Sequence, residues 1–364
     1  MNFDWLEERF GDPICKHGGR KDADNGEFLD FSANVNPYAP DPNVLKIAKR
    51  LVASKDFYVG YPDSSYAKAR NALASYVGNG VRESNVILSN GTIELIKLFC
   101  EVFTRGNAAV AIPTFCEYER FSRINGANMK FIQRSDKFEN DTVNAICDNL
   151  GKDFGTFFIC NPNNPTGRLI RRDTMIEVAQ MLEDKGVMLF VDEAFIDFAP
   201  EESIIGDVQD HRNIVVGRSL TKILGIPGIR LGYGVAHEDT ISYIKKAQMP
   251  WSVNNLAKGI AEEISKFRNF MSSSVRKLEI EREFLIRGLS NIDGIHIGPS
   301  NTNYLFLHMD GNTSSKIAKD MRDRGILIRK CDSFRGCDDS CIRIAVRDRA
   351  ENERLVESFM ALYE

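Results

Sequence analysis

The chain has 364 residues, of which 43% are hydrophobic and 27% charged, with 27 glycines and 12 prolines. This composition is typical of a folded globular protein, and it excludes both a small disulfide-stabilised scaffold and a disordered chain. The 47 lysines and arginines against 51 aspartates and glutamates give a net charge of −4, which leaves no basic excess for non-specific binding to nucleic acid. One hydrophobic core rarely organises this many residues, so we predict a large domain and a smaller one.

Membrane and secretion signals are weak. The longest apolar runs, residues 108–113 and 186–191, are far shorter than the roughly 20 residues that span a bilayer. The first eight residues include acidic side chains where a secretory signal carries basic ones. We therefore expect a cytoplasmic protein.

The eight cysteines are scattered, which in a reducing compartment predicts free thiols. Three of them lie close together, but their spacings of five and three intervening residues differ from the C-x₂-C pairs of zinc sites. No metal site is therefore predicted. The cysteines are Cys15, Cys100, Cys116, Cys147, Cys160, Cys331, Cys337 and Cys341.

From residue 86 to residue 234 short β-branched runs alternate with longer amphipathic stretches. This alternation indicates repeated βαβ units and so predicts an α/β fold, with a seven-stranded, mostly parallel sheet and helices on both of its faces. The predicted strands cover residues 86–88, 108–112, 129–132, 157–160, 188–191, 214–217 and 231–235.

The C-terminal third has a different pattern. Residues 255–289 contain no proline and many charged side chains, which predicts one long helix or two consecutive helices. The segments that follow predict a smaller α+β domain. Its expected strands are 304–308, 326–329 and 342–346, with a helix at 314–324. We therefore expect an N-terminal arm over 1–40 that contributes to the substrate site and the dimer, a large domain over 41–254 and a small domain over 255–364.

Common nucleotide and metal motifs are absent. The chain has no G-x-x-x-x-G-K-[ST] and no H-E-x-x-H, and residues 78–80 lack the third glycine of a dinucleotide fingerprint. Kinase-like and zinc-protease functions therefore lose support.

A different group of side chains follows three consecutive predicted strands. Asn164, Asp192 and Lys222 each come just after a strand, with separations of 28 and 30 residues. Such spacing is about the length of one βαβ unit, so we expect the three side chains to share one crevice at the carboxyl edge of the sheet. An amide, a carboxylate and a lysine in one crevice match the needs of pyridoxal phosphate (PLP).

The phosphate of PLP also needs donors. Residues 89–92 lie between a strand and a helix, so their backbone N–H groups can bind an anion at the helix N-terminus. Ser219 can add a hydroxyl and Arg230 a charged guanidinium. Phe115 is a candidate to stack on the ring of the cofactor.

With these motifs, the chain resembles, over essentially its whole length, the fold-type I PLP-dependent transferases close to histidinol-phosphate aminotransferase. Within that family it is most similar to the decarboxylases of L-threonine O-3-phosphate. The segments that carry this second similarity are 17–19 (HGG), 30–37 (DFSANVNP), 192–198 (DEAFIDF) and 248–254 (QMPWSVN).

The resemblance implies that Lys222 forms a Schiff base with PLP, that Asp192 pairs with the pyridine nitrogen and that Asn164 bonds the O3′ oxygen. It also implies a homodimer with shared sites, in which Tyr61 reaches the cofactor of the second subunit. The implied phosphate site consists of Asn90, Gly91, Thr92, Ser219 and Arg230.

For the substrate, the resemblance implies that Arg343 binds the carboxylate. Aminotransferases of this family usually carry tyrosine where this chain has Phe195, and the decarboxylases share the phenylalanine. Where the family often reads His-Gly-Gly-Asn, the chain has arginine in the fourth place. The remaining substrate-site candidates, chiefly for a substrate phosphate, are Arg347, Arg329, His17, Arg20 and Asn34.

The implied activity is that of a lyase of cobalamin biosynthesis, which decarboxylates L-threonine O-3-phosphate to (R)-1-amino-2-propanol O-2-phosphate. An aminotransferase for histidinol phosphate is a second hypothesis. A ligand-sensing regulator with this fold is a third, although neither end of the chain has room or charge for a DNA-binding module. The sequence does not separate threonine phosphate from serine phosphate, since one methyl group changes binding by only roughly 1 to 3 kcal/mol.

Overall fold

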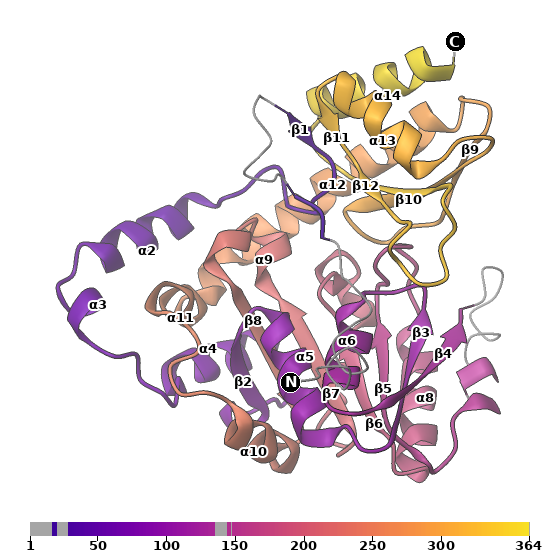
Figure 1. The fold of residues 1–364 in the computed structure, drawn as a ribbon. Coiled ribbons are helices and arrows are strands. Elements are labelled where there is room, and N and C mark those ends of the chain that lie inside the picture. Colours follow the sequence, from indigo (N-terminus) through magenta and orange to yellow (C-terminus); the bar gives the residue numbers. More distant parts are fainter. Residues whose placement is uncertain (1–16, 20–27, 135–143, 147, 364) are drawn as a thin grey trace, which may run out of the picture.

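The structure is a computed structural model that describes residues 17–19, 28–134, 144–146 and 148–363. A smaller C-terminal part packs against a large part that is built around one sheet, and the long helix α12 (Arg268–Leu289) runs between the two (Figure 1). In the described part of the chain, no helix is long and apolar enough to cross a membrane.

The sheet of the large part has seven strands, and each of them matches a predicted one. The strands are β2 (Val86–Asn90), β3 (Asn107–Ile112), β4 (Asn128–Gln133), β5 (Phe154–Cys160), β6 (Met188–Asp192), β7 (Ile214–Ser219) and β8 (Leu231–Ala236). They lie side by side in the order β2, β8, β7, β6, β5, β3, β4. Only β8 is antiparallel to its neighbours, so the predicted, mostly parallel α/β fold is confirmed.

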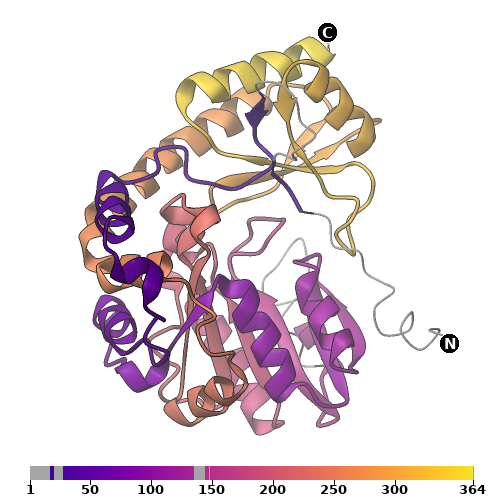
Figure 2. The same ribbon diagram turned by 60° about the vertical axis from the view of Figure 1, so that its left-hand side comes forward.

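Both faces of the sheet are buried, which explains why its strands are continuous apolar runs. Successive side chains of a strand point to opposite faces, so Phe157 and Phe158 enter different cores, and both are fully buried. Helices pack on each side (Figure 2). One face is covered by α4 (Ala67–Val77), α8 (Arg172–Asp184) and α11 (Asn255–Glu262), and the other by α5 (Thr92–Phe103), α6 (Glu117–Ile124) and α10 (Glu238–Ala247).

The C-terminal part is a four-stranded antiparallel sheet with helices, as the predicted α+β composition requires. Its strands lie in the order β12 (Arg329–Lys330), β13 (Cys341–Ala345), β10 (Tyr304–Met309) and β9 (Ile295–Ile297). Helices α12, α13 (Ser314–Asp323) and α14 (Arg349–Tyr363) enclose its apolar core.

The N-terminal segment joins this C-terminal core. Strand β1 (Leu29–Asp30) pairs in parallel with β11 (Ile326–Leu327), and Phe31 is fully buried among the C-terminal apolar side chains. The predicted strand over 326–329 is therefore two short strands, because β11 pairs with β1 whereas β12 pairs with β13.

The helical prediction for residues 255–289 is confirmed in its two-helix form. Asn254 begins α11, since its side-chain oxygen accepts a hydrogen bond from the N–H of Ala257 at 2.9 Å. A short 3₁₀ turn, η5 (Ile264–Phe267), separates α11 from α12. Three more α-helices lie wholly within the described residues, namely α2 (Pro42–Val52), α3 (Asp56–Val59) and α9 (Leu220–Ile223).

The cysteines depart from the prediction at one place. Cys116 is disulfide-bonded, so the expectation of free thiols is wrong there. Sequence spacing cannot show which sulfur atoms meet in space, since a disulfide depends on the approach of two backbone segments. Among the described residues no group of three or more His, Cys, Asp or Glu side chains could hold a metal ion. The free thiols are Cys100, Cys160, Cys331, Cys337 and Cys341.

Candidate active site

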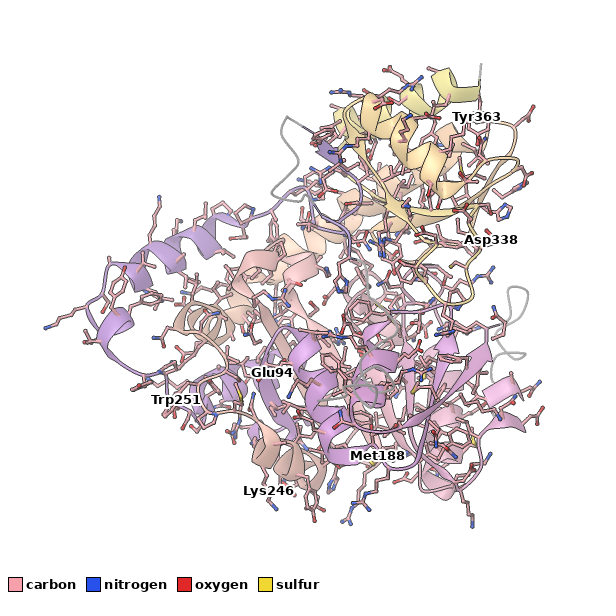
Figure 3. The ribbon with its side chains drawn as sticks, in the orientation of Figure 1. Glu94, Met188, Lys246, Trp251, Asp338 and Tyr363 are labelled. Atoms are coloured by element: carbon pink, nitrogen blue, oxygen red, sulfur yellow. The ribbon has the colours of Figure 1, made fainter. Side chains whose placement is uncertain are left out.

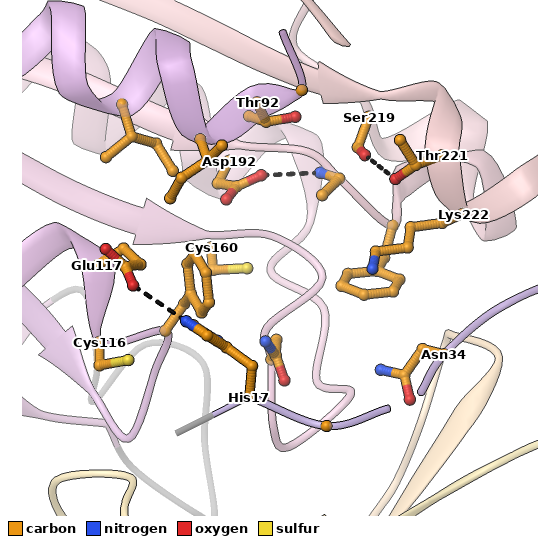
Figure 4. Close-up of a pocket in the computed structure, with 18 of the residues that line it drawn as sticks. His17, Asn34, Thr92, Cys116, Glu117, Cys160, Asp192, Ser219, Thr221 and Lys222 are labelled. Carbon is orange, nitrogen blue, oxygen red and sulfur yellow. Dashed lines mark hydrogen bonds and ion pairs between the residues drawn. The ribbon is translucent and has the colours of Figure 1, made fainter. Parts of the chain in front are cut away.

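The carboxyl ends of β5, β6 and β7 open onto a pocket of about 460 Å³ (Figure 4). Open α/β sheets present their ligand sites at this edge. Asn164, Asp192 and Lys222 all line the pocket, so the fold brings together the three side chains that the strand spacing predicted. The opposite wall comes from the C-terminal part, through Arg329 and Arg343.

Lys222 lies in α9, directly after β7. Its Nζ is 5.9 Å from the centre of the Phe195 ring. Burial, together with the nearby positive charges of Arg343 and Arg230, lowers the pKa of Lys222 to about 8. At neutral pH an amine with this pKa is neutral in about a tenth of the molecules, far more than for an ordinary lysine, and only the neutral amine is a nucleophile.

Asp192 ends β6, and its carboxylate is buried. The Tyr118 hydroxyl donates a hydrogen bond to Oδ2 at 2.6 Å, and the N–H of Ala194 donates to Oδ1 at 3.0 Å. Burial raises the pKa of Asp192 to about 6, although these two hydrogen bonds and the charge of Lys222 act to lower it. A positive group in the pocket would favour the ionised form further.

Backbone and hydroxyl donors gather at the start of α5. Gly91 has a φ of 71°, and a Cβ on it would lie 2.6 Å from Nη2 of Arg230, so only glycine allows the guanidinium this close to the helix N-terminus. The Ser219 and Thr221 hydroxyls are 2.7 Å apart on the same side of the pocket. A helix N-terminus with hydroxyls and an arginine is suited to a phosphate.

Arg343, on β13, links the C-terminal part to the strand ends of the large sheet. Its Nη1 donates to Oδ1 of Asn164 at 2.5 Å and its Nη2 donates to the carbonyl oxygen of Ser32 at 2.9 Å. The third nitrogen, Nε, is buried without a hydrogen-bond partner. Its guanidinium also packs over the Tyr304 ring, 5.3 Å from the centre.

Four further predicted residues line the pocket. Phe115 lies with its ring centre 5.9 Å from that of His17. Arg329 donates from Nη2 to Oγ of Ser333 at 2.9 Å. Asn34 is buried, and its Oδ1 has no hydrogen-bond partner in the structure.

The structure does not bring every predicted residue into this pocket. Arg347 binds both carboxylate oxygens of Glu351, at 2.8 and 3.0 Å. Tyr61 is 81% exposed, and its ring centre lies 4.6 Å from that of Trp251, with the two rings tilted, at the edge of the large part (Figure 3). Asn90 is exposed at the end of β2, and its N–H contacts Glu94.

Arg20 lies outside the described residues.

The sequence analysis missed four functional candidates that the structure places at or beside the pocket. Tyr118 lies in the first turn of α6, three residues after Phe115, and this spacing was the only signal available for it. No motif pointed to the others, which are Thr221, Glu117 and Arg120.

The chain belongs to the aminotransferase class I and II family, whose family model matches residues 26–359. It is 32% identical to the threonine-phosphate decarboxylase of Salmonella typhimurium, over 91% of this chain and 90% of that protein. It is 33% identical to the histidinol-phosphate aminotransferase of Roseiflexus castenholzii, over 97% of this chain and 91% of that protein.

Two solved structures have the same fold. The histidinol-phosphate aminotransferase of Clostridium acetobutylicum superposes with a TM-score of 0.84, and the L-threonine-O-3-phosphate decarboxylase of Porphyromonas gingivalis with a TM-score of 0.80. Each is 27% identical, and each covers 92% of this chain and 99% of its own. The protein is therefore a fold-type I PLP enzyme, and the relatives named above include both activities.

The donor set of the pocket fits PLP group by group. The start of α5, the two hydroxyls and Arg230 suit a phosphate, Lys222 suits an aldehyde, and Asp192 suits a protonated pyridine nitrogen. Glycine at position 91 leaves the space that the Arg230 guanidinium needs beside the helix N-terminus.

Binding of PLP to the apoprotein is expected to accelerate with pH with a midpoint near pH 8, because Lys222 must lose its proton before it can attack the aldehyde. Stopped-flow measurements across this range test the expectation. Arg343→Gln removes a nearby positive charge and should move the midpoint upward. A wild-type midpoint near the ordinary lysine value of 10.5 would contradict the prediction.

Proposed function

We propose that the protein decarboxylates L-threonine O-3-phosphate, releasing CO₂ and (R)-1-amino-2-propanol O-2-phosphate, a building block for the linker of the cobalamin nucleotide loop. One observation carries the proposal. Besides Lys222, and Arg230 beside the start of α5, the pocket is lined by four more basic side chains. These are His17, Arg120, Arg329 and Arg343. A substrate with two separate anionic groups accounts for this number.

In this proposal the cofactor is held by the residues at the strand ends. Gly91, Thr92, Ser219 and Arg230 bind its phosphate, with Thr221 beside them. Asp192 binds the pyridine nitrogen, and Asn164 bonds the O3′ oxygen. Phe115 covers one face of the ring.

Arg343 is assigned to the substrate carboxylate. It is already fixed by Asn164 and Ser32, and its unpartnered Nε is one buried donor that a ligand can satisfy. Arg329, on the same C-terminal wall, is assigned to the substrate phosphate. Two anchors on one small molecule restrict its rotation, and each charged hydrogen bond contributes about 1.5 to 3 kcal/mol to this alignment.

When bound, PLP withdraws electrons from the Cα of the amino acid, so that the bond perpendicular to its ring breaks most readily. The side chains of this protein then decide which bond that is. If Arg343 and the phosphate anchors hold the carboxylate perpendicular, CO₂ leaves rather than a proton. Lys222, whose pKa of about 8 is close to neutrality, is assigned the return of a proton to Cα.

Phe195 gives a second line of support. Aminotransferases of the family usually have a tyrosine hydroxyl at this place, and here a phenylalanine packs edge-on against Tyr304 at 4.9 Å. The Tyr304 hydroxyl is directed elsewhere, because it donates to the carbonyl oxygen of Asn163 at 2.8 Å. The electronic environment of the cofactor therefore differs from that of a typical aminotransferase.

Histidinol-phosphate aminotransfer is the alternative, and the 33% identity to such an enzyme favours it about as much as the 32% identity favours decarboxylation. The two activities need different substrate contacts. Histidinol phosphate has a phosphate but no carboxylate, so in that reaction Arg343 would bind a carboxylate only when the second substrate, 2-oxoglutarate, is in the site.

We also propose a homodimer in which Tyr61 reaches the site of the partner subunit. Tyr61 belongs to an exposed apolar group that a monomer would leave in water, and such groups often mark interfaces. The group consists of Tyr58, Val59, Tyr61, Met249 and Trp251. A dimeric mass in solution is the expected observation.

The purified holoenzyme is expected to release CO₂ and aminopropanol phosphate from L-threonine O-3-phosphate without any keto acid. Serine phosphate and histidinol phosphate, the latter with 2-oxoglutarate, are the comparison substrates. Turnover of histidinol phosphate alone, with conversion of the cofactor to its amine form, would replace the proposal with the alternative.

A further inference from the structure

Glu117 is a buried carboxylate in the first turn of α6, and it holds two basic side chains of the pocket. Its Oε1 lies 3.1 Å from Nε2 of His17, and its Oε2 accepts from Nη1 of Arg120 at 2.8 Å. The Glu117 side chain is 3% exposed. Figure 4 shows the contact between Glu117 and His17 at the pocket wall.

A buried carboxylate is costly unless donors satisfy it, and here each oxygen has one. Burial acts to raise the pKa of Glu117, but the hydrogen bonds from His17 and Arg120 outweigh it, so the pKa is lowered. Glu117 is therefore a stable anion whose two partners are fixed in place.

The two partners remain open on their other sides. The side chains of His17 and Arg120 are 55% and 48% exposed, and both line the pocket that contains Lys222 and Arg343. Arg120 also packs on the Phe121 ring, 5.3 Å from its centre, which further restricts its position. Only Nη1 of Arg120 is used by Glu117, and the other N–H groups of its guanidinium suit a phosphate.

This arrangement goes beyond what PLP requires, since the start of α5 already supplies the cofactor's phosphate site. We propose that Arg120 binds the phosphate of the substrate and that Glu117 is the positioning residue that holds Arg120, with His17 beside it, toward that phosphate. Arg329 lies on the opposite wall, so the substrate phosphate is gripped from both α6 and the C-terminal part. The pair thereby selects phosphorylated over unphosphorylated amino acids.

The inference rests on the proposed function in that the substrate carries a phosphate. Two measurements separate the two ideas. The KM for L-threonine O-3-phosphate depends on the proposed reaction, whereas the dissociation constant of inorganic phosphate, measured by calorimetry on the holoenzyme, does not. The variants are Arg120→Gln and Glu117→Gln. The control is Arg123→Gln, on the same helix, which contacts Glu119 and does not line the pocket.

Arg120→Gln is expected to raise both the KM and the dissociation constant of phosphate by about 10- to 100-fold, as the loss of a charged hydrogen bond implies, while kcat changes by less than about threefold. Glu117→Gln should give a smaller rise in KM and in the dissociation constant of phosphate. In the double variant the fold-increase should be smaller than the product of the two single fold-increases, because Glu117 acts through Arg120. Arg123→Gln should resemble the wild type in every measurement.

Unchanged phosphate affinity in Arg120→Gln would overturn the inference, even if the wild type decarboxylates threonine phosphate. If the variants lose cofactor content without a change in KM, the inference would also be overturned, because Glu117 and Arg120 would then have only a structural role. A wild type that fails to decarboxylate but binds phosphate through Arg120 would refute the proposed function and leave this site in place.

Discussion

Replacing Lys222 with alanine is expected to lower the rate by at least about 10³-fold, because one side chain supplies both the covalent link to PLP and the proton for Cα. Lys222 is the buried amine that the pocket presents, and its pKa near 8 suits both roles. Borohydride reduction should fix the cofactor on the wild type and not on Lys222→Ala. Activity of the alanine variant within tenfold of the wild type would exclude this role for Lys222.

The same variant tests the shared site. If Tyr61 of one subunit completes the site of the other, Tyr61→Ala is also impaired, and mixing it with Lys222→Ala forms hybrid dimers with one intact site. Random exchange in a two-fold dimer would restore about a quarter of the wild-type activity. If subunit exchange is verified and the mixture still shows no recovery of activity, a cross-subunit role of Tyr61 would be contradicted.

Asp192→Asn has the second largest expected effect, a loss of about 10² to 10⁴ in kcat, since an amide does not stabilise a protonated pyridine nitrogen as a carboxylate does. The variant should still bind PLP through Lys222, so its cofactor content should stay near that of the wild type while kcat falls. Equal loss of both would show that Asp192 matters for assembly of the site rather than for chemistry.

Tyr118→Phe tests the ionisation of Asp192 by a milder change, since it leaves the carboxylate in place and removes one of its hydrogen bonds. Burial raises the pKa of Asp192 to about 6, and the hydrogen bond from Tyr118 is the first of the influences that oppose it. Removing that bond raises the pKa further, so a larger fraction of Asp192 is protonated at a given acidic pH. The acid limb of the profile for PLP binding should therefore move to higher pH, with a much smaller effect near pH 8.

The strands of the large sheet were predictable because burial on both faces makes each one a continuous apolar run. β5 and β6 show this clearly, with Phe157, Phe158 and Phe190 all fully buried. The division of 326–329 was not predictable, since the pairing of β11 with β1 depends on residues almost 300 positions away. Local pattern carries no information on such a partner.

The site shows the same limit. Asn164, Asp192 and Lys222 follow strands at regular spacing, and a parallel sheet places such residues together. Arg347 is four residues after Arg343 and would share its face if β13 continued, but β13 ends at Ala345 and Arg347 turns to Glu351 in α14. Glu117 and Arg120 had no motif at all, because the contact that connects Glu117 with His17 links residues 100 positions apart.

The pairing of β1 with β11 has a consequence for the order in which the protein is made. Residues 29–31 leave the ribosome almost 300 residues before their hydrogen-bond partners, Gly325, Leu327 and Ala345. The large sheet can assemble beforehand, while the C-terminal wall of the pocket waits for both of these segments. Folding of this wall is therefore tied to synthesis of residues 325–345, and a chain interrupted before them would have a formed large sheet without the arginines proposed to bind the substrate.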